Sequence, residues 1–370
     1  MDQRQGILEN LEMTLFADIY RGKRVLITGH TGFKGSWLTL WLSELGAQVT
    51  GIALAPATTP SHWQLLELPV DDAPLDITDA ASLAAELQKT QPEVVFHLAA
   101  QPLVRRSYRD PLETWSTNVI GTANLLEACR HCTSVKAIVV ITTDKCYENR
   151  EWEWGYRETD RLGGHDPYSA SKAAAELVVG SYRQAFFAKA GAPLLASARA
   201  GNVIGGGDWS EDRLIPDIVR AVSEKTVLKI RSPGATRPWQ HVLESLSGYL
   251  LLGQKLLEEQ QEFAQAWNFG PEADGNRTVE DVLIRLQKAW PAISWSVAGG
   301  ELPHEANLLH LDSAKAKSRL GWCPVWPLEQ TLTATAQWYR SYVENSAVIS
   351  AAQLRAYIDA ANAAGLAWTR

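Results

Sequence analysis

A glycine-rich turn near the N-terminus constrains the fold of this chain more than any other feature. Residues 24–28 form a largely apolar run typical of a buried strand, and Gly29, Gly32 and Gly35 follow it at even spacing. Apolar residues at helical spacing come next. In such a unit the first glycine permits a tight turn, the second lets the backbone approach a pyrophosphate, and the third lets the helix pack on the strand. The turn therefore predicts a dinucleotide site, with a ligand-free glycine turn as the alternative.

Strand-like and helix-like segments alternate up to about residue 200, and the alternation then loosens. This pattern predicts the α/β class: a Rossmann-type, doubly wound parallel sheet with a smaller α/β C-terminal lobe. The predicted strands are 24–28, 48–54, a short one ending at 76–77, 93–100, 136–141 and 194–200. The predicted parts are an N-terminal extension (1–20), a dinucleotide-binding domain (21–200, with a returning helix near 241–259), a second lobe (201–240 and 265–345) and a C-terminal helical tail (346–370). The extension is either a short surface helix or a disordered arm.

A cluster of polar residues follows the predicted strand 136–141. Thr143, Asp144 and Lys145 stand where that strand ends. Because ligands bind at the carboxyl ends of strands in an open parallel sheet, these hydroxyl, carboxylate and amine groups are expected to face a cleft.

Tyr168 and Lys172 stand one helical turn apart on a helix that Pro167 is expected to start. An ammonium beside a phenol favours its ionised form, which is a usable base near neutral pH. The pair therefore predicts proton transfer at an alcohol carbon beside a hydride acceptor. An ordinary exposed helix pair is the alternative.

The predicted cofactor is NAD. No arginine follows strand 48–54 to hold the 2′-phosphate of NADP, although no acidic residue stands there for the ribose either. Asp76 is expected to accept from the adenine amino group or to cap the next helix, and Asn118 to support the active site or to face solvent. The residues predicted to contact the cofactor are Gly29, Thr31, Gly32, Phe33, Lys34, Gly35, Asp76, Ile77, Leu98, Ala99, Ala100, Asn118, Tyr168 and Lys172.

Composition excludes several classes of protein. The chain has 370 residues, 46% hydrophobic content and a net charge of −7, so it can bury a large core but has no general attraction for nucleic acid. No apolar run approaches a membrane span, and no signal pattern argues for export. Four cysteines are too few for a disulfide framework and indicate a reducing compartment, the cytoplasm. Cys129 and Cys132 lack a second pair of ligands, so no metal is expected.

The glycine turn and the set Thr143, Tyr168 and Lys172 resemble the extended short-chain dehydrogenase/reductase family over residues 21–345. Asp144 after Thr143 points to its nucleotide-sugar 4,6-dehydratases, since an epimerase needs no acid to expel a C6 hydroxyl. Relatives that act on dTDP-glucose carry Thr-Asp-Glu. Here Lys145 stands in place of that glutamate, and the chain is instead similar to the branch that acts on CDP-glucose. The motifs that carry this similarity are Gly-His-Thr-Gly-Phe-Lys-Gly, Ala-Ala-Gln-Pro-Leu-Val-Arg, Asp-Lys-Cys-Tyr-Glu-Asn and Gly-Gly-His-Asp-Pro-Tyr-Ser.

This resemblance implies a catalytic role for each of the five polar residues. Tyr168 would take the 4-hydroxyl proton as C4 passes hydride to NAD, Lys172 would keep the phenolate accessible, and Thr143 would position the 4-oxygen. Asp144 would protonate the departing 6-hydroxyl, and hydride would return to C6. In relatives the glutamate takes the C5 proton. Lys145 would act as a neutral amine, stabilise the enolate, or leave this step to another group.

The implied substrate is CDP-glucose or a related nucleotide sugar, held largely by the second lobe. The candidate substrate ligands are Gln101, His165, Asn202, Arg231 and Arg237. Guanidinium groups suit a diphosphate, and solvated surface arginines are the alternative. Alternative functions are a dehydratase of dTDP-glucose or GDP-mannose, a 4-epimerase, and a non-catalytic dinucleotide-binding regulator. Helices 111–130 and 167–189 correspond to those that pair across a dimer in this family, so a homodimer is expected.

Overall fold

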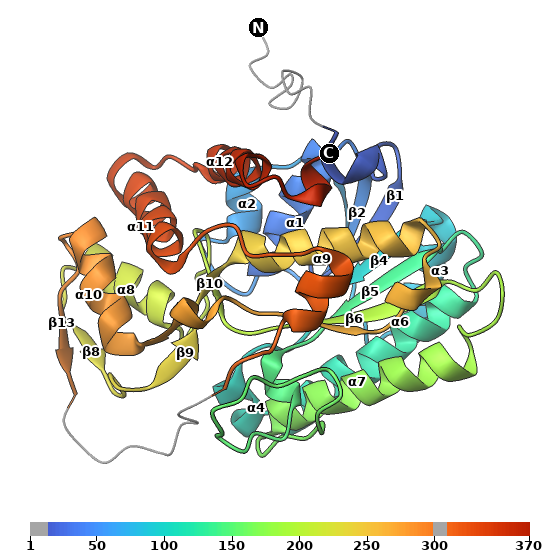
Figure 1. Cartoon of the computed structure of the whole chain (residues 1–370), viewed down its shortest axis with the longest axis horizontal. Coiled ribbons are helices and arrows are strands. Elements are labelled where there is room, and N and C mark those ends of the chain that lie inside the picture. Colours follow the sequence, from blue (N-terminus) through green and yellow to red (C-terminus); the bar gives the residue numbers. More distant parts are fainter. Residues whose placement is uncertain (1–13, 299–308) are drawn as a thin grey trace, which may run out of the picture.

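The computed structural model describes residues 14–298 and 309–370, which are built on one central sheet (Figure 1). Seven parallel strands lie in the order β11-β6-β5-β4-β1-β2-β3, which confirms the predicted fold class. Their bounds are β1 (Arg24–Thr28), β2 (Gln48–Ala53), β3 (Asp71–Pro74), β4 (Val94–His97), β5 (Ala137–Ile141), β6 (Leu194–Ala200) and β11 (Ala266–Phe269). From β1 the chain adds β2 and β3 on one side, and it then crosses to the other side of β1 to add β4 and the remaining strands. At such a switch point the strand ends leave a crevice for a ligand.

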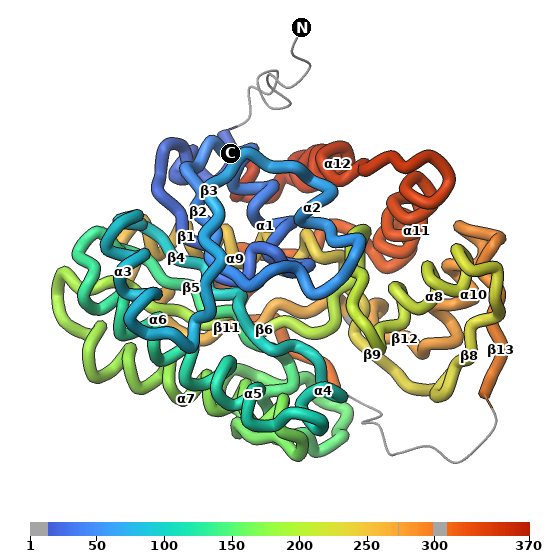
Figure 2. Tube along the Cα trace, turned by 180° about the vertical axis from the view of Figure 1, so that it is seen from behind, coloured from blue at the N-terminus to red at the C-terminus, as the bar shows by residue number. Residues whose placement is uncertain are grey.

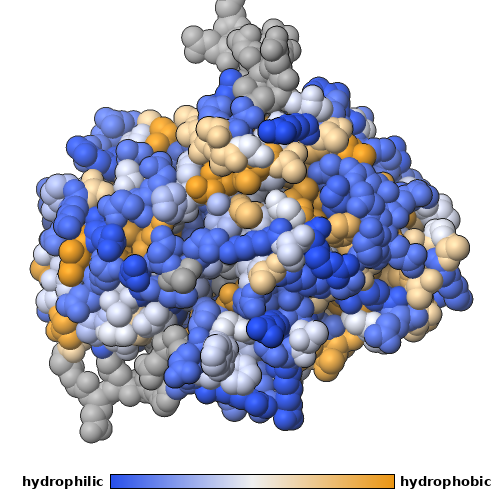
Figure 3. Space-filling model, viewed as in Figure 1, coloured by the Kyte–Doolittle hydropathy of each residue, from blue (hydrophilic) through white to orange (hydrophobic). Residues whose placement is uncertain are grey.

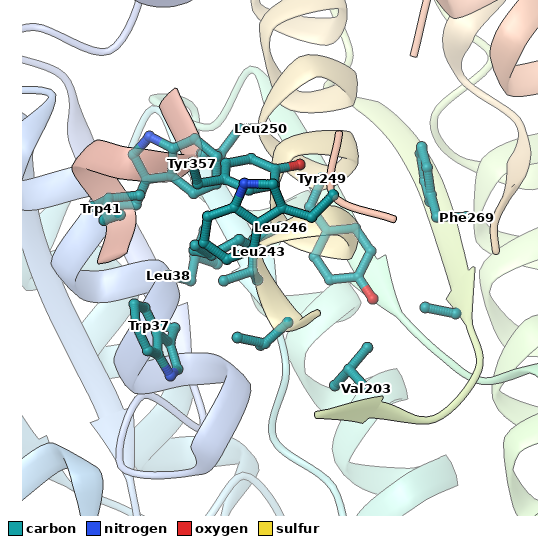
Figure 4. Close-up of a cluster of buried hydrophobic side chains, with 14 of the residues drawn as sticks. Trp37, Leu38, Trp41, Val203, Leu243, Leu246, Tyr249, Leu250, Phe269 and Tyr357 are labelled. Atoms are coloured by element: carbon teal, nitrogen blue, oxygen red, sulfur yellow. The ribbon is translucent and has the colours of Figure 1, made fainter. Parts of the chain in front are cut away.

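Helices cover both faces of the sheet, because side chains alternate between the two faces along each strand. One face carries α1 (Phe33–Glu44) and α9 (Val242–Leu257), with α12 (Ser350–Ala363) packed on α1, and the other carries α3 (Ala80–Thr90), α6 (Gly121–Arg130) and α7 (Pro167–Ala185). Val25 and Ile27 of β1 belong to the first core cluster, whereas Leu26 belongs to the second. Figure 4 shows part of the first cluster, where Trp41 and Leu246 lie between α1 and α9.

A smaller group of elements lies to one side of the sheet in both views (Figures 1 and 2). It contains α8 (Leu214–Ser223), α10 (Val279–Ala289), the parallel pair β8 (Leu228–Ile230) and β13 (Trp295–Val297), and the antiparallel pair β9 (Thr236–Pro238) and β12 (Asn276–Thr278). The chain also forms α2 (His62–Leu66), α4 (Val104–Arg109), α5 (Pro111–Trp115), α11 (Leu328–Asn345), and the strands β7 (Val203–Ile204) and β10 (Gln240–His241).

Several predicted boundaries differ from the structure. The third strand ends at Pro74, before the predicted 76–77, and α7 ends at Ala185, where the chain turns to bury Phe187. The predicted helix 111–130 is interrupted by the π-helical turn η2 (Ser116–Ile120) between α5 and α6. The second lobe was expected to resume at residue 265. Instead, β11 pairs with β6 and forms the edge strand of the central sheet, so the lobe resumes only after it.

The described part of the N-terminal extension is neither a surface helix nor a disordered arm. Residues 1–13 lie outside the described residues. Leu15 begins a short turn, η1 (Leu15–Asp18), which carries Phe16 into the core. The ring of Phe16 stacks on Trp368 with 5.1 Å between centroids, and the Tyr20 hydroxyl donates to the Leu250 carbonyl at 2.6 Å. Phe16 and Tyr20 therefore complete the core on the α1 side together with Trp368.

Among the residues described, no helix is both long and apolar enough to cross a bilayer. Figure 3 shows a mostly hydrophilic face with scattered hydrophobic side chains, as is normal for a folded protein with a net charge of −7.

We expect Gly206→Ala to destabilise the fold by about 1–3 kcal/mol through overpacking. A Cβ at Gly206 would lie 1.9 Å from the ring of Trp338, which is fully buried on α11. Gly234→Ala is the matched control, because a Cβ there meets nothing within 4 Å. Urea unfolding of both variants measures the difference, and equal midpoints would contradict the packing at this site.

Candidate active site

The reactive residues from β5 meet at the end of that strand. The turn η3 (Asp144–Cys146) follows it, and Thr143 caps the turn, its Oγ1 accepting from the Lys145 amide at 3.3 Å. The same hydroxyl donates to Asp144 Oδ1 at 2.9 Å and hydrogen-bonds the Tyr168 side chain. Asp144 is buried. A hydroxyl, a carboxyl and a phenol are thus joined in one hydrogen-bonded group.

The other reactive residues, Tyr168 and Lys172, lie on the helix α7. Asp166 caps its start by accepting from the Ser169 amide at 2.9 Å, and Pro167 occupies the first turn, as expected for a helix N-terminus. Tyr168 and Lys172 are both buried, and Lys172 Nζ donates to the Ile141 carbonyl at 3.4 Å. Both side chains therefore lie at the end of β5, so the alternative of an exposed helix pair is wrong.

Burial dominates the electrostatics of Tyr168 and Lys172. Burial raises the pKa of the Tyr168 phenol to about 12; the hydrogen bond with Thr143 lowers it, and the charge of Asp144 raises it further. Burial also lowers the pKa of Lys172 to about 8, against the attraction of Glu176. Desolvation therefore outweighs the charge interactions at both groups, and the expectation that Lys172 favours the phenolate stays a prediction.

Lys145 faces two acceptors. Its Nζ lies 3.5 Å from Asp144 Oδ1 and 3.4 Å from Asn202 Oδ1. Asn202, predicted to bind substrate, follows the end of β6. The amine is thus held beside the buried carboxyl by residues from two neighbouring strand ends.

A buried ion pair behind the reactive group was missed by the sequence analysis. Glu176 accepts from Thr142 Oγ1 at 2.5 Å, from Ser197 Oγ at 2.8 Å and from Arg199 Nη2 at 2.8 Å. These contacts join α7 to β5 and β6. Glu176 stands one helical turn after Lys172 on the buried face of α7, and this spacing could have indicated it.

The glycine turn is shaped as a dinucleotide site requires. Gly29 has a φ of +76°, and a Cβ there would lie 2.6 Å from the Ala99 amide nitrogen. A Cβ at Gly35 would lie 2.1 Å from the Gly29 carbonyl. Gly32 caps α1 without any side chain, so the amides of its first turn are open to an anion. The turn therefore fits a pyrophosphate.

The outer part of the predicted cofactor site is more exposed. The carboxylate of Asp76 is exposed and accepts from the Thr78 amide at 2.9 Å, while Asp79 caps α3. The alternative that Asp76 caps this helix is therefore wrong. Thr31 Oγ1 donates to the Leu54 carbonyl at 3.0 Å, and Ile77 is buried against Gly121. Contact of these residues with the cofactor stays a prediction.

Asn118 supports the site rather than facing solvent. It is 1% exposed and lies in the π-helical turn η2. Its side chain accepts from the Gln101 amide at 2.8 Å and donates to the Gln101 carbonyl at 3.2 Å and to Ser171 Oγ at 2.9 Å. The side chain of Gln101 bonds Leu103 within the loop and Thr114 on α5. Both residues hold the loop after β4 against α7.

The other predicted substrate ligands lie farther out. His165 is exposed just before α7. Arg231 is exposed after β8, 3.8 Å from Asp212 Oδ1. Arg237 lies in β9, where its Nη1 donates to the Thr236 carbonyl at 2.9 Å. Their contact with a substrate stays a prediction.

Comparison with known proteins shows that this chain is similar to nucleotide-sugar dehydratases and epimerases. The model of the family described as GDP-mannose 4,6 dehydratase matches residues 26–335. A CDP-glucose 4,6-dehydratase from Salmonella typhimurium is 48% identical over 352 residues, covering 93% of this chain and 98% of that protein. DesIV, a dTDP-glucose 4,6-dehydratase from Streptomyces venezuelae solved with NAD and TYD bound, has a TM-score of 0.74 at 25% identity, over 87% of this chain and 97% of its own. A UDP-glucose 4-epimerase from Thermus thermophilus in complex with NAD shares the fold, with a TM-score of 0.73 at 24% identity over 86% and 99%.

Asn118→Ala is expected to lower the free energy of unfolding by about 2–4 kcal/mol, because it removes buried hydrogen bonds and leaves the Gln101 amide unsatisfied. Asn124→Ala, in the same helical segment, is the control. Asn124 is only partly buried and donates to the Ile77 and Thr78 carbonyls, so its loss should cost about 1 kcal/mol. Equal stability losses in urea unfolding would contradict the supporting role of Asn118.

Proposed function

Since the chain belongs to the GDP-mannose 4,6-dehydratase family, we propose that it converts CDP-D-glucose to CDP-4-keto-6-deoxy-D-glucose with loss of water. The observation that carries this proposal is the 48% identity to a CDP-glucose 4,6-dehydratase along nearly the whole of both chains. The enzyme acts as a carbon–oxygen lyase in deoxysugar biosynthesis. The four cysteines are free, which suits a reducing compartment such as the cytoplasm.

The cofactor is NAD, and when bound it would supply hydride transfer from C4 of the sugar and back to C6. The glycine turn and the start of α1 would hold its pyrophosphate, with Leu98 to Ala100 beside the turn. Tyr168 takes the proton of the 4-hydroxyl, and Thr143, already bonded to the Tyr168 side chain, positions the 4-oxygen. Lys172 lies at the end of β5, where its Nζ donates to the Ile141 carbonyl.

Asp144 is the acid of the elimination step. Once C4 is a ketone, the C5 proton is acidic. A basic group other than the Lys145 ammonium takes this proton, the C6–oxygen bond breaks, and a proton returns to C5 when hydride reaches C6. Asp144 donates a proton to the departing 6-hydroxyl, which leaves as water. Its burial and its bond from Thr143 hold the carboxyl at the reacting sugar rather than in solvent.

Lys145 stabilises the enolate formed at C5 and C4. It donates toward two oxygens, Asp144 Oδ1 and Asn202 Oδ1, an arrangement that suits an ammonium better than a base. Nucleotide-sugar binding belongs to the second lobe, residues 201–240 and 270–345, with Arg231 and Arg237 as ligands of the diphosphate.

The proposal is tested by incubating the purified protein with NAD and, separately, CDP-, dTDP-, GDP- and UDP-hexoses. The expected result is a 4-keto-6-deoxy sugar, lighter than the substrate by one water, from CDP-glucose alone. Product from a different nucleotide sugar would show that CDP-glucose is not the substrate. An epimerised sugar of unchanged mass would show that the reaction is not a dehydration.

The variant Asp144→Asn should still remove hydride from C4, but its rate of water elimination should fall by about 10²- to 10⁴-fold, because the substitution removes the proton donor. We expect reduced nicotinamide absorbance to build up with CDP-glucose while little 4-keto-6-deoxy product forms. Tyr168→Phe is the control, since it should abolish both signals. Normal product formation by Asp144→Asn would show that another group is the acid.

Lys145→Ala should slow exchange of the C5 proton with solvent deuterium, because the enolate loses its counter-charge. Mass spectrometry of the product formed in deuterium oxide measures this exchange. Exchange at the wild-type rate would remove Lys145 from the C5 step.

The protein assembles as a homodimer through the segment α5–η2–α6 and the helix α7, which pack against each other within the chain. Leu112, Ile120 and Leu177, on α5, η2 and α7, are exposed hydrophobic residues that such a contact would cover. Sedimentation should show a dimer that Ile120→Glu dissociates. Ile284→Glu, which changes an exposed residue on α10, should leave the dimer intact, and a monomeric wild-type protein would contradict this assembly.

A further inference from the structure

Two ion pairs join α4 to the segment that follows β7, residues 208–213, which we call the clasp. Arg105 Nη1 donates to Asp212 Oδ1 at 2.5 Å, and Arg109 Nη2 donates to Glu211 Oε1 at 2.6 Å. The helix α4 follows β4 of the central sheet, whereas the clasp leads into α8 of the smaller group of elements (Figures 1 and 2). The ion pairs therefore bridge these two parts of the protein.

Both of the bridged segments also contact the reactive residues. On α4, the buried Ser107 Oγ accepts from the Tyr168 amide at 3.2 Å. The chain that leads to the clasp passes Asn202, whose Oδ1 lies 3.4 Å from Lys145 Nζ. The clasp therefore connects two segments that each adjoin the reactive residues, and it lies where the central sheet meets the second lobe.

The clasp is anchored at its base and held by exposed ion pairs at its tip. At the base, Asp208 is 4% exposed, its carboxylate accepts from Arg213 Nη1 at 2.9 Å, and the Tyr339 hydroxyl donates to its carbonyl at 2.5 Å. At the tip, Asp212 has a φ of +57°, which residues other than glycine rarely adopt. The side chains of Arg105 and Asp212 are 42% and 34% exposed, and exposed ion pairs contribute little stability. The tip can therefore part from α4 while the base stays in place.

A second arginine shares the carboxylate at the tip. Asp212 Oδ1, which accepts from Arg105, also lies 3.8 Å from Arg231 Nη2. Two guanidinium groups from different parts of the chain thus converge on one carboxylate oxygen. The same arrangement of guanidinium groups suits a diphosphate. The proposed function already gives Arg231 this role, but it does not include Arg105.

We propose that the Asp212 carboxylate occupies the place of the substrate's diphosphate, and that Arg105 and Arg231 bind the diphosphate once Asp212 has moved away. The clasp is then a gate that the substrate itself opens. A diphosphate carries more negative charge than one carboxylate, so it competes for the two arginines, which stay paired with an anion throughout. A nucleoside without phosphate has no group to exchange for Asp212. The inference deepens the proposed function and rests on a nucleotide sugar as the substrate.

Calorimetric titration with CDP in the presence of NAD tests this exchange without turnover, because CDP carries the diphosphate but no sugar. Asp212→Asn keeps the size of the side chain and removes its charge, so CDP should bind about 3- to 10-fold more tightly than to wild type at low ionic strength. Cytidine, which has no phosphate, should bind both proteins equally. Glu211→Gln is the matched control, because it removes the neighbouring charge, and its dissociation constant for CDP should stay within about 2-fold of wild type.

Double variants identify the arginine that receives the diphosphate. Combining Arg105→Gln with Asp212→Asn should abolish the tighter binding of CDP, whereas combining Arg109→Gln with Asp212→Asn should keep it. The opposite result would remove Arg105 from the diphosphate site and overturn the inference.

Unchanged CDP binding by Asp212→Asn would also overturn it, and so would equal tightening by Glu211→Gln, which would show a general effect of charge. A wild-type protein that binds dTDP or UDP but not CDP would instead show that the proposed substrate is wrong, and the same variants would then be compared with the diphosphate that binds. A protein that binds no nucleoside diphosphate would overturn both proposals.

Discussion

The position of α7 over the central sheet depends on the buried carboxylate of Glu176. Hydrogen bonds from Thr142, Ser197 and Arg199 fix this carboxylate to β5 and β6. Because Tyr168 and Lys172 lie earlier on the same helix, the contact also sets their distance from the residues that follow β5. A buried ion pair adds little net stability, but removing one partner would leave the other charge buried and unpaired. Its main effect here is therefore geometric.

The features predicted from sequence are those encoded by neighbouring residues. The strand 24–28 and the turn at Gly29 were recognised because local apolar patterning and glycine spacing are sufficient to define them. The pairing of Tyr168 with Lys172 followed from helical periodicity alone. The meeting of these elements followed from the rule that ligands bind at the carboxyl ends of parallel strands.

The features that sequence did not predict depend on contacts between distant segments. Phe16 enters the core because Trp368, at the other end of the chain, provides a surface for it. β11 joins the central sheet by pairing with β6, which no local pattern specifies. The raised pKa of Tyr168 reflects burial that only the assembled site creates. The burial of Asn118 likewise depends on the packing of the loop after β4 against α7, which the local sequence does not specify.

We propose that one hydride leaves C4 and returns to C6 of the same sugar, within a single site. The measurement that we would make is the fate of deuterium in CDP-glucose labelled at C4 and mixed with unlabelled substrate. The deuterium should appear at C6 of the labelled product molecules and should not pass to the unlabelled ones. Loss of deuterium to solvent, or its appearance in products of unlabelled substrate, would contradict transfer through a cofactor that stays bound between the two steps.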